Sequence, residues 1–139
     1  MNARNLVESV NDELSNAARL LKAAEALVAL ELYPDALNRA YYCVFHLTRA
    51  LLLMMGDEPS SHAGAKSLLG LRLVKPGLLP KRATDIFSNL EEGRTAADYQ
   101  RFVVIGQEKA SEGIVQAKEF SAMTQAFMSS QGFGAKPSE

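Results

Sequence analysis

Neither glycine nor proline occurs before Pro34, and the apolar residues of this first segment recur at steps of three and four. The members of the series are Leu6, Val10, Leu14, Ala17, Leu20, Leu21, Ala24, Leu27 and Val28. Such spacing gathers apolar side chains on one face of an α-helix, which turns once in about 3.6 residues. The sequence therefore predicts a long amphipathic helix over residues 5–32.

Pro34 opens a second segment, residues 34–55, which is the most apolar part of the chain. Proline suits the first turn of a helix, where its missing N–H is no loss. Gly56 and Pro59 then mark the C-terminal end. The predicted core stripe of this helix holds Leu37, Tyr41, Val44, Leu47 or Thr48, Leu51 and Met55.

Turn-forming residues divide the rest of the chain into shorter helices. Ser60 or Ser61 is predicted to cap a short helix that ends near Leu69, and residues 70–77 are predicted to form a loop. A further helix is expected over residues 80–90.

Residues 91–94 are predicted to break the helical pattern, or at least to weaken it, and Thr95 or Asp98 would then cap the last helix. Gly106 and Gly113 lie within that helix, where each weakens it by up to about 1 kcal/mol relative to alanine. The apolar positions assigned to it are Phe102, Ile105, Ile114, Val115, Ala117, Phe120, Met123 and Phe127.

No segment shows the alternation that is typical of strands joined by hairpins. Four main helices with short connections predict an all-α fold, an antiparallel up-and-down four-helix bundle with an additional short helix. A chain of 139 residues with 47% hydrophobic residues can build one domain with a real core. We expect that domain to span residues 1–130, with residues 131–139 as a flexible tail.

Composition argues against several classes of protein. The formal net charge is −1, so the overall charge does not indicate a nucleic-acid-binding domain. No apolar run has the length of a membrane span, and the N-terminus does not resemble a signal peptide. Cys43 is the single cysteine, so we expect a small core residue and no internal disulfide. A cytoplasmic protein with no membrane partner is the default expectation.

Arg39 and His46 form the most informative chemical pair in the chain. Seven positions are almost two helical turns, so both side chains project from one face, about 10 Å apart along the axis. Guanidinium binds anionic oxygens bidentately, and imidazole moves protons near neutral pH. The pair therefore suits phosphodiester cleavage without a metal, and we expect no metal site and no cofactor.

The surrounding residues, Asn38-Arg39-Ala40-Tyr41-Tyr42 followed by Phe45-His46, resemble the SRAYYxxFH signature of the HEPN superfamily, in particular its branch of small uncharacterised proteins. Three further elements occur in the family's order. Residues 61–64 resemble its HsG element, residues 75–77 its K-x-G loop and residues 94–99 its R-x-x-x-DY segment. The resemblance covers about residues 5–128, although Asn38 stands where the branch often has serine.

The resemblance implies a helical bundle that forms a homodimer. Many HEPN domains carry Arg-x(4–6)-His, which is a metal-independent ribonuclease site in characterised members, and Arg39 and His46 match this pattern. Many small members are encoded beside a minimal nucleotidyltransferase as toxin–antitoxin pairs. The implied partners are therefore RNA or a nucleotide, an antitoxin-like nucleotidyltransferase and a second copy of the chain.

In this interpretation His46 acts as general base on the ribose 2′-OH, or as acid toward the leaving oxygen. Arg39 stabilises charge that develops on the phosphoryl oxygens. Tyr42 offers a ring on which a base can stack. His62, the only other histidine, and Arg94 are further candidates for binding substrate.

Asn38, Asp98 and Tyr99 are predicted to support the Arg39 face without reacting themselves. Other interpretations remain open at this point. Arg39 could pair with Asp98, and His46 could be an ordinary packing residue. Of the adjacent tyrosines, one is expected in the core and one beside the site, unless both merely pack.

His62 could instead border a loop near a helix start, and Arg94 could form a surface salt bridge. At the level of function, the alternatives are a non-catalytic module that binds a nucleotide or presents substrate to a nucleotidyltransferase, and a plain interaction scaffold. A catalyst needs Arg39 and His46 accessible in one cleft, whereas a scaffold would bury both.

Overall fold

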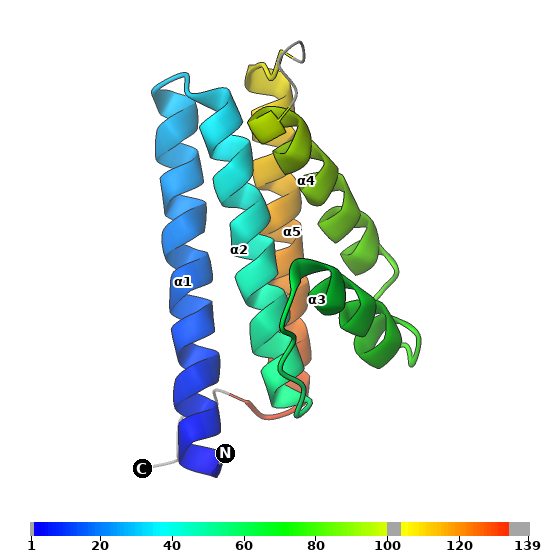
Figure 1. Cartoon of the computed structure of the whole chain (residues 1–139). Helices are drawn as coiled ribbons and strands as arrows, with labels where there is room; N and C mark the ends of the chain where they lie inside the picture. Colours follow the sequence, from blue (N-terminus) through cyan, green and yellow to red (C-terminus); the bar gives the residue numbers. More distant parts are fainter. Residues whose placement is uncertain (1, 100–103, 134–139) are drawn as a thin grey trace.

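The computed structural model describes residues 2–99 and 104–133. These residues form α1 (Ala3–Ala29), α2 (Tyr33–Met54), α3 (His62–Leu69), the π-helical turn η1 (Gly70–Val74), α4 (Arg82–Tyr99) and α5 (Gln107–Ser130). In Figure 1, α1 and α2 run side by side with α5 behind α2, whereas α4 leans away and α3 lies in front. The predicted all-α bundle of four long helices and one short helix is confirmed for the described residues.

Local side-chain chemistry explains where several helices begin. The Asn2 side chain accepts a hydrogen bond from the Asn5 backbone N–H at 2.9 Å, and this caps α1. Pro34 lies in the first turn of α2, as the sequence predicted. Ser61, one of the two predicted caps of α3, accepts from the Gly64 N–H at 2.9 Å.

Helix α2 is the central element, since it packs against α1, α3, α4 and α5. Its predicted stripe lies in the core, with Leu37, Tyr41, Val44, Leu47, Thr48 and Leu51 buried and Met55 partly buried. The buried Thr48 hydroxyl donates to the Val44 carbonyl, so its burial leaves no unpaired donor. Cys43 is also a core residue, and burial raises the pKa of its thiol to about 12.

The predicted break at residues 91–94 is wrong, because α4 continues through it to Tyr99. Gly93 is buried, and a Cβ atom there would lie 2.9 Å from Cδ2 of Leu37. The glycine therefore serves close packing between α4 and α2. It does not end a helix.

The predicted start of the last helix at Thr95 or Asp98 is also wrong, because both residues lie in α4. Helix α5 begins at Gln107, and Gly106 is its N-cap residue with extended backbone. Phe102, which was assigned to this helix, lies outside the described residues. The predicted loop over residues 70–77 is wrong in its first half, where η1 continues the turn of α3.

Residues 131–133 form a turn after α5, and Phe133 packs against the core. Residues 134–139 of the predicted flexible tail lie outside the described part of the chain. Across the residues that are described, we find no helix with the length and hydrophobicity needed to cross a membrane.

Candidate active site

Arg39 lies on an open face of α2 and is exposed to solvent. Its Nη1 donates to Oδ1 of Asn38 at 3.3 Å. The alternative that Arg39 pairs with Asp98 is not what the structure shows, because Asp98 Oδ2 accepts from Asn38 Nδ2 at 3.0 Å and lies 3.5 Å from Arg94 Nε. Within the described residues Arg39 forms no ion pair, so its guanidinium remains available to an anion.

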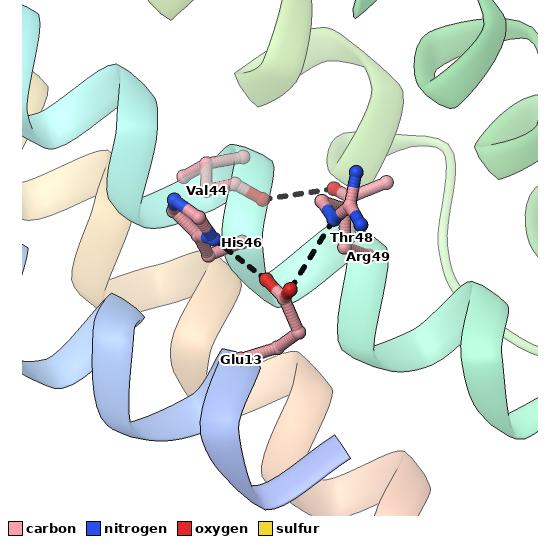
Figure 2. A network of polar contacts seen from close by, with 5 residues as sticks. All are labelled: Glu13, Val44, His46, Thr48 and Arg49. Atoms are coloured by element: carbon pink, nitrogen blue, oxygen red, sulfur yellow. Dashed lines mark hydrogen bonds and ion pairs between the residues drawn. The ribbon is translucent and has the colours of Figure 1, made fainter. Parts of the chain in front are cut away.

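His46, seven positions further along α2, is held by a carboxylate from α1 (Figure 2). Its Nδ1 lies 2.6 Å from Oε2 of Glu13, whose other oxygen accepts from Arg49 Nε at 3.3 Å. Since an ionised carboxylate can only accept, Nδ1 of His46 carries the proton. The other ring nitrogen, Nε2, points away from Glu13 in Figure 2. In the neutral ring it keeps a lone pair that can take a proton.

Glu13 and Arg49 were not predicted as site residues, although the sequence holds a signal for Glu13. It lies three positions after Val10 and four before Ala17, within the stripe that packs against α2. Its side chain is only 15% exposed. A carboxylate on the apolar face of an amphipathic helix requires hydrogen-bonding partners. A pairing of Glu13 with a basic side chain of α2 could therefore have been predicted.

Tyr41 and Tyr42 face different surroundings, as their adjacency on a helix predicted. Tyr41 is fully buried, and its hydroxyl lies 2.6 Å from Nδ1 of His62. Burial, aided by the nearby Glu91 carboxylate, raises the pKa of Tyr41 to about 12, so the phenol keeps its proton. Tyr42 is half-buried and accepts a hydrogen bond from Arg94 Nη2 at 3.1 Å.

Arg94 comes from α4 and lies beneath three tyrosine rings rather than on the open surface. Its guanidinium carbon is 5.4 Å from the Tyr41 ring centroid, 5.5 Å from that of Tyr42 and 5.9 Å from that of Tyr99. Such distances are within the range of cation–π attraction. Arg94 therefore braces the tyrosines, and Tyr99 itself remains 71% exposed.

His62 is the first residue of α3 and stacks on Phe45, with 4.2 Å between ring centroids. Phe45 also meets His46 edge-on at 5.7 Å, so one phenyl ring contacts both imidazoles. Burial and the Arg94 charge lower the pKa of His62, against a smaller opposing effect of Glu91. The ring is consequently uncharged at neutral pH.

Stability should fall in mild acid because of His62. Its pKa is 6.5 when unperturbed and lower in the folded chain, so the unfolded state binds more protons between the two values. The contribution of neutral His62 to folding stability is then fully present above about pH 6.5, and it is lost as the pH drops toward the folded-state pKa. Thermal unfolding at pH 7.5 and pH 5.5 should show a smaller drop in Tm for His62→Gln than for wild type. An equal drop in both proteins would contradict this assignment.

The structure thus brings together most of the residues proposed from sequence. Tyr42, Arg94, Asp98 and Asn38 form one chain of contacts that ends at Arg39. His46 belongs to a separate network with Glu13 and Arg49 (Figure 2). Arg39 and His46 share a helix face without touching.

An all-helical bundle whose central helix presents an arginine and a carboxylate-bound histidine on one face defines the class of protein. A model of the HEPN domain family matches residues 10–126, and the chain belongs to this family. The predicted membership is confirmed. The match includes all the site residues from Glu13 to Tyr99.

Curated relatives agree with this assignment. A protein of Methanocaldococcus jannaschii with the name "Putative toxin MJ0605" is 34% identical over 96 residues, which cover 69% of this chain and 72% of that protein. A "UPF0332 protein" of Thermotoga maritima is 31% identical over 104 residues, 75% of this chain and 79% of its own length.

Among solved structures, the crystal structure of TT1696 from Thermus thermophilus has the same fold. Its TM-score is 0.71 at 17% sequence identity, and the alignment covers 85% of this chain and 97% of that one. At this identity the likeness concerns the arrangement of helices alone.

Proposed function

We propose that this chain is a metal-independent endoribonuclease, the toxin of a toxin–antitoxin pair, with Arg39 and His46 as its catalytic residues. The carrying observation is the short contact between His46 Nδ1 and Glu13, which leaves Nε2 as an acceptor on the face that also bears the exposed Arg39. The toxin names of relatives support the biological role, and the motif resemblance supports the chemistry.

In the proposed reaction, His46 Nε2 takes the proton from a ribose 2′-OH. The 2′ oxygen then bonds to the adjacent phosphorus while the bond from phosphorus to the 5′ oxygen breaks. The leaving 5′ oxygen takes a proton from the imidazolium of His46 in a second copy of the chain. The imidazolium formed in the first copy then loses its proton to water, and the neutral imidazole of the second copy takes one up from water, which restores the starting state. The products are a 2′,3′-cyclic phosphate and a 5′-hydroxyl.

Each neighbour of His46 has a defined part in this scheme. Glu13 fixes the tautomer and stabilises the imidazolium that forms when Nε2 accepts the proton. Arg49 pairs with the second Glu13 oxygen and so holds that carboxylate in place. Arg39 offers its fork of N–H donors to the phosphoryl oxygens, where negative charge grows in the transition state.

The proposal is tested by incubating purified protein with single-stranded RNA in EDTA. Cleavage that produces 2′,3′-cyclic phosphate ends is the expected result. The proposed activity would be contradicted if folded, dimeric protein left the RNA intact after prolonged incubation at high protein concentration.

Glu13→Gln should lower kcat by about 10- to 100-fold, less than loss of the base itself. Glutamine keeps the size of the side chain but removes the charge that stabilises the imidazolium, while KM should change little. Glu8→Gln, on the exposed side of α1, is the matched control, because Glu8 pairs only with Arg4 among the described residues. Equal kcat values for the two variants would remove Glu13 from the mechanism.

We also propose that a nucleotidyltransferase holds this activity in check in the cytoplasm, and that the chain works as a homodimer. The motif resemblance supports both statements, and the dimer would supply the second imidazole. Sedimentation of the purified chain tests the dimer. The partner is tested by asking whether a neighbouring reading frame encodes a nucleotidyltransferase and whether that protein suppresses RNA cleavage.

A non-catalytic nucleotide-binding module is the second candidate function. The exposed Arg39 and the stacked rings of Phe45 and His62 favour it over a plain scaffold, which would bury both predicted catalytic residues. Such a module should retain nucleotide affinity in His46→Ala and cleave nothing.

A further inference from the structure

The hydrogen bond between Tyr41 and His62 determines the tautomer of His62. The Tyr41 hydroxyl is fully buried and lies 2.6 Å from Nδ1 of the ring. Among the described residues this hydroxyl has no other hydrogen-bond partner, so its proton is donated to Nδ1, which accepts. The proton of the neutral imidazole must then be on Nε2, at the edge of the ring that faces away from Tyr41.

The same reasoning gives His46 the opposite tautomer, because its Nδ1 donates to the Glu13 carboxylate. The two imidazoles contact one phenyl ring, His62 stacked on Phe45 at 4.2 Å and His46 edge-on at 5.7 Å. The site therefore holds one ring whose Nε2 accepts and a second ring whose Nε2–H donates. A proton acceptor and a neutral donor therefore both lie beside Phe45, and a ribose 2′-OH and its adjacent phosphate need one group of each kind.

We propose that His62 binds the substrate directly and donates an uncharged hydrogen bond from Nε2–H to a phosphoryl oxygen of the RNA bound at His46. This proposal rests on the ribonuclease function proposed above. In it His62 exchanges no proton with the substrate, which separates it from the general acid that a second histidine would ordinarily suggest.

The charges around His62 are consistent with a donor that is uncharged at neutral pH. Arg94 from α4 and His46 from α2 disfavour the imidazolium, whereas Glu91 from α4 favours it less strongly. Lys66 of α3 forms an ion pair with Glu91 at 3.2 Å and so reduces the field of that carboxylate at the ring. Tyr42 meets the ring edge-on and contributes no charge while its phenol is protonated.

Stacking on Phe45 and the bond to Tyr41 fix the orientation of the donor before substrate arrives. A preorganised donor costs no reorientation when charge develops on the phosphoryl oxygen. Removal of one such donor typically lowers a rate by about 10²–10³-fold.

The test compares His62→Gln with His62→Met. Both side chains are of similar length and lose the imidazole stack, but only glutamine presents an N–H near the place of Nε2. We expect kcat/KM of the glutamine variant to remain within about 10-fold of wild type, and that of the methionine variant to fall by about 10²-fold. The pH–rate profile of His62→Gln should keep both limbs of the wild-type profile.

Two outcomes would overturn the proposal. Equal activity of the two variants would show that the donor has no role, and loss of the alkaline limb in His62→Gln would show that His62 transfers a proton. Circular dichroism spectra of both variants serve as the control that they are folded.

A second measurement separates this inference from the ribonuclease proposal. Affinity for an RNA oligonucleotide with 2′-O-methyl groups, which cannot be cleaved, should be weaker for His62→Met than for His62→Gln. If wild type cleaves no RNA, the same difference in affinity would support the donor and refute the nuclease. Equal affinities would refute the donor whether or not the protein cleaves RNA.

Discussion

His46→Ala should lower the rate of RNA cleavage in EDTA by about 10²–10⁴-fold, the contribution of a positioned general base. The variant loses the only ring whose Nε2 is set as an acceptor among the described residues, and Glu13 is left without its imidazole partner. The measurement is the initial rate of cleavage of a fluorescent RNA oligonucleotide with wild type and variant at equal concentration.

Arg39→Ala should lower the same rate by about 10²–10³-fold, because the variant loses the donors that stabilise charge on the phosphoryl oxygens. The fold should be unaffected, since the Arg39 guanidinium is exposed and has no carboxylate partner among the described residues. Arg39→Lys keeps the charge but loses the bidentate fork, so an intermediate rate is expected. Arg4→Ala on α1 is the matched control for loss of an exposed arginine. Equal rates in wild type, His46→Ala and Arg39→Ala would end the ribonuclease proposal.

The binding of an uncleavable oligonucleotide distinguishes catalysis from simple binding in the same variants. His46→Ala should bind nearly as tightly as wild type under both proposed functions, because it keeps Arg39. Only the catalytic function predicts that its cleavage rate falls. A wild-type protein that binds RNA and does not cleave it would therefore select the binding module.

The helical architecture could be predicted because local signals determine it. The three- and four-residue spacing of apolar side chains from Leu6 to Val28 is a property of one segment, and it matches α1 closely. The cap at Ser61 and the proline in the first turn of α2 could likewise be predicted, because each acts on the backbone within one turn of the helix start. Arg39 and His46 share a face for the same reason, since their relative direction depends only on the helical repeat.

Contacts between helices were less predictable. Glu13 lies 33 positions before its partner His46, and no local pattern in either helix specifies that they meet. The tautomers of His46 and His62 depend entirely on such distant partners. The wrong prediction at Gly93 has a related cause. Glycine occurs where the backbone needs conformational freedom, which ends a helix, and also where another helix packs closely against it. Only the position of Leu37 distinguishes the two cases.

Leu37 lies between two glycines from different helices, and their joint replacement should be strongly destabilising. A Cβ atom at Gly93 of α4 would lie 2.9 Å from Leu37 Cδ2, and one at Gly113 of α5 would lie 2.6 Å from Leu37 Cδ1. After either single substitution Leu37 can shift toward the remaining glycine. In the double variant both of its methyl groups are blocked, and Leu37 itself is only 2% exposed.

Gly93→Ala and Gly113→Ala together should therefore cost about 2–3 kcal/mol of unfolding free energy, more than the sum of the single changes. The gain in helix propensity, up to about 1 kcal/mol for each alanine, opposes this cost and makes the single variants nearly neutral. Gly70→Ala is the control, because its nearest neighbour, Thr84 Cγ2, is 3.8 Å from the new Cβ and its backbone is already helical. Urea unfolding of the four proteins and wild type measures these values. Additive effects in the double variant would show that Leu37 does not couple the two glycines, and that α4 and α5 can each move away from α2 independently.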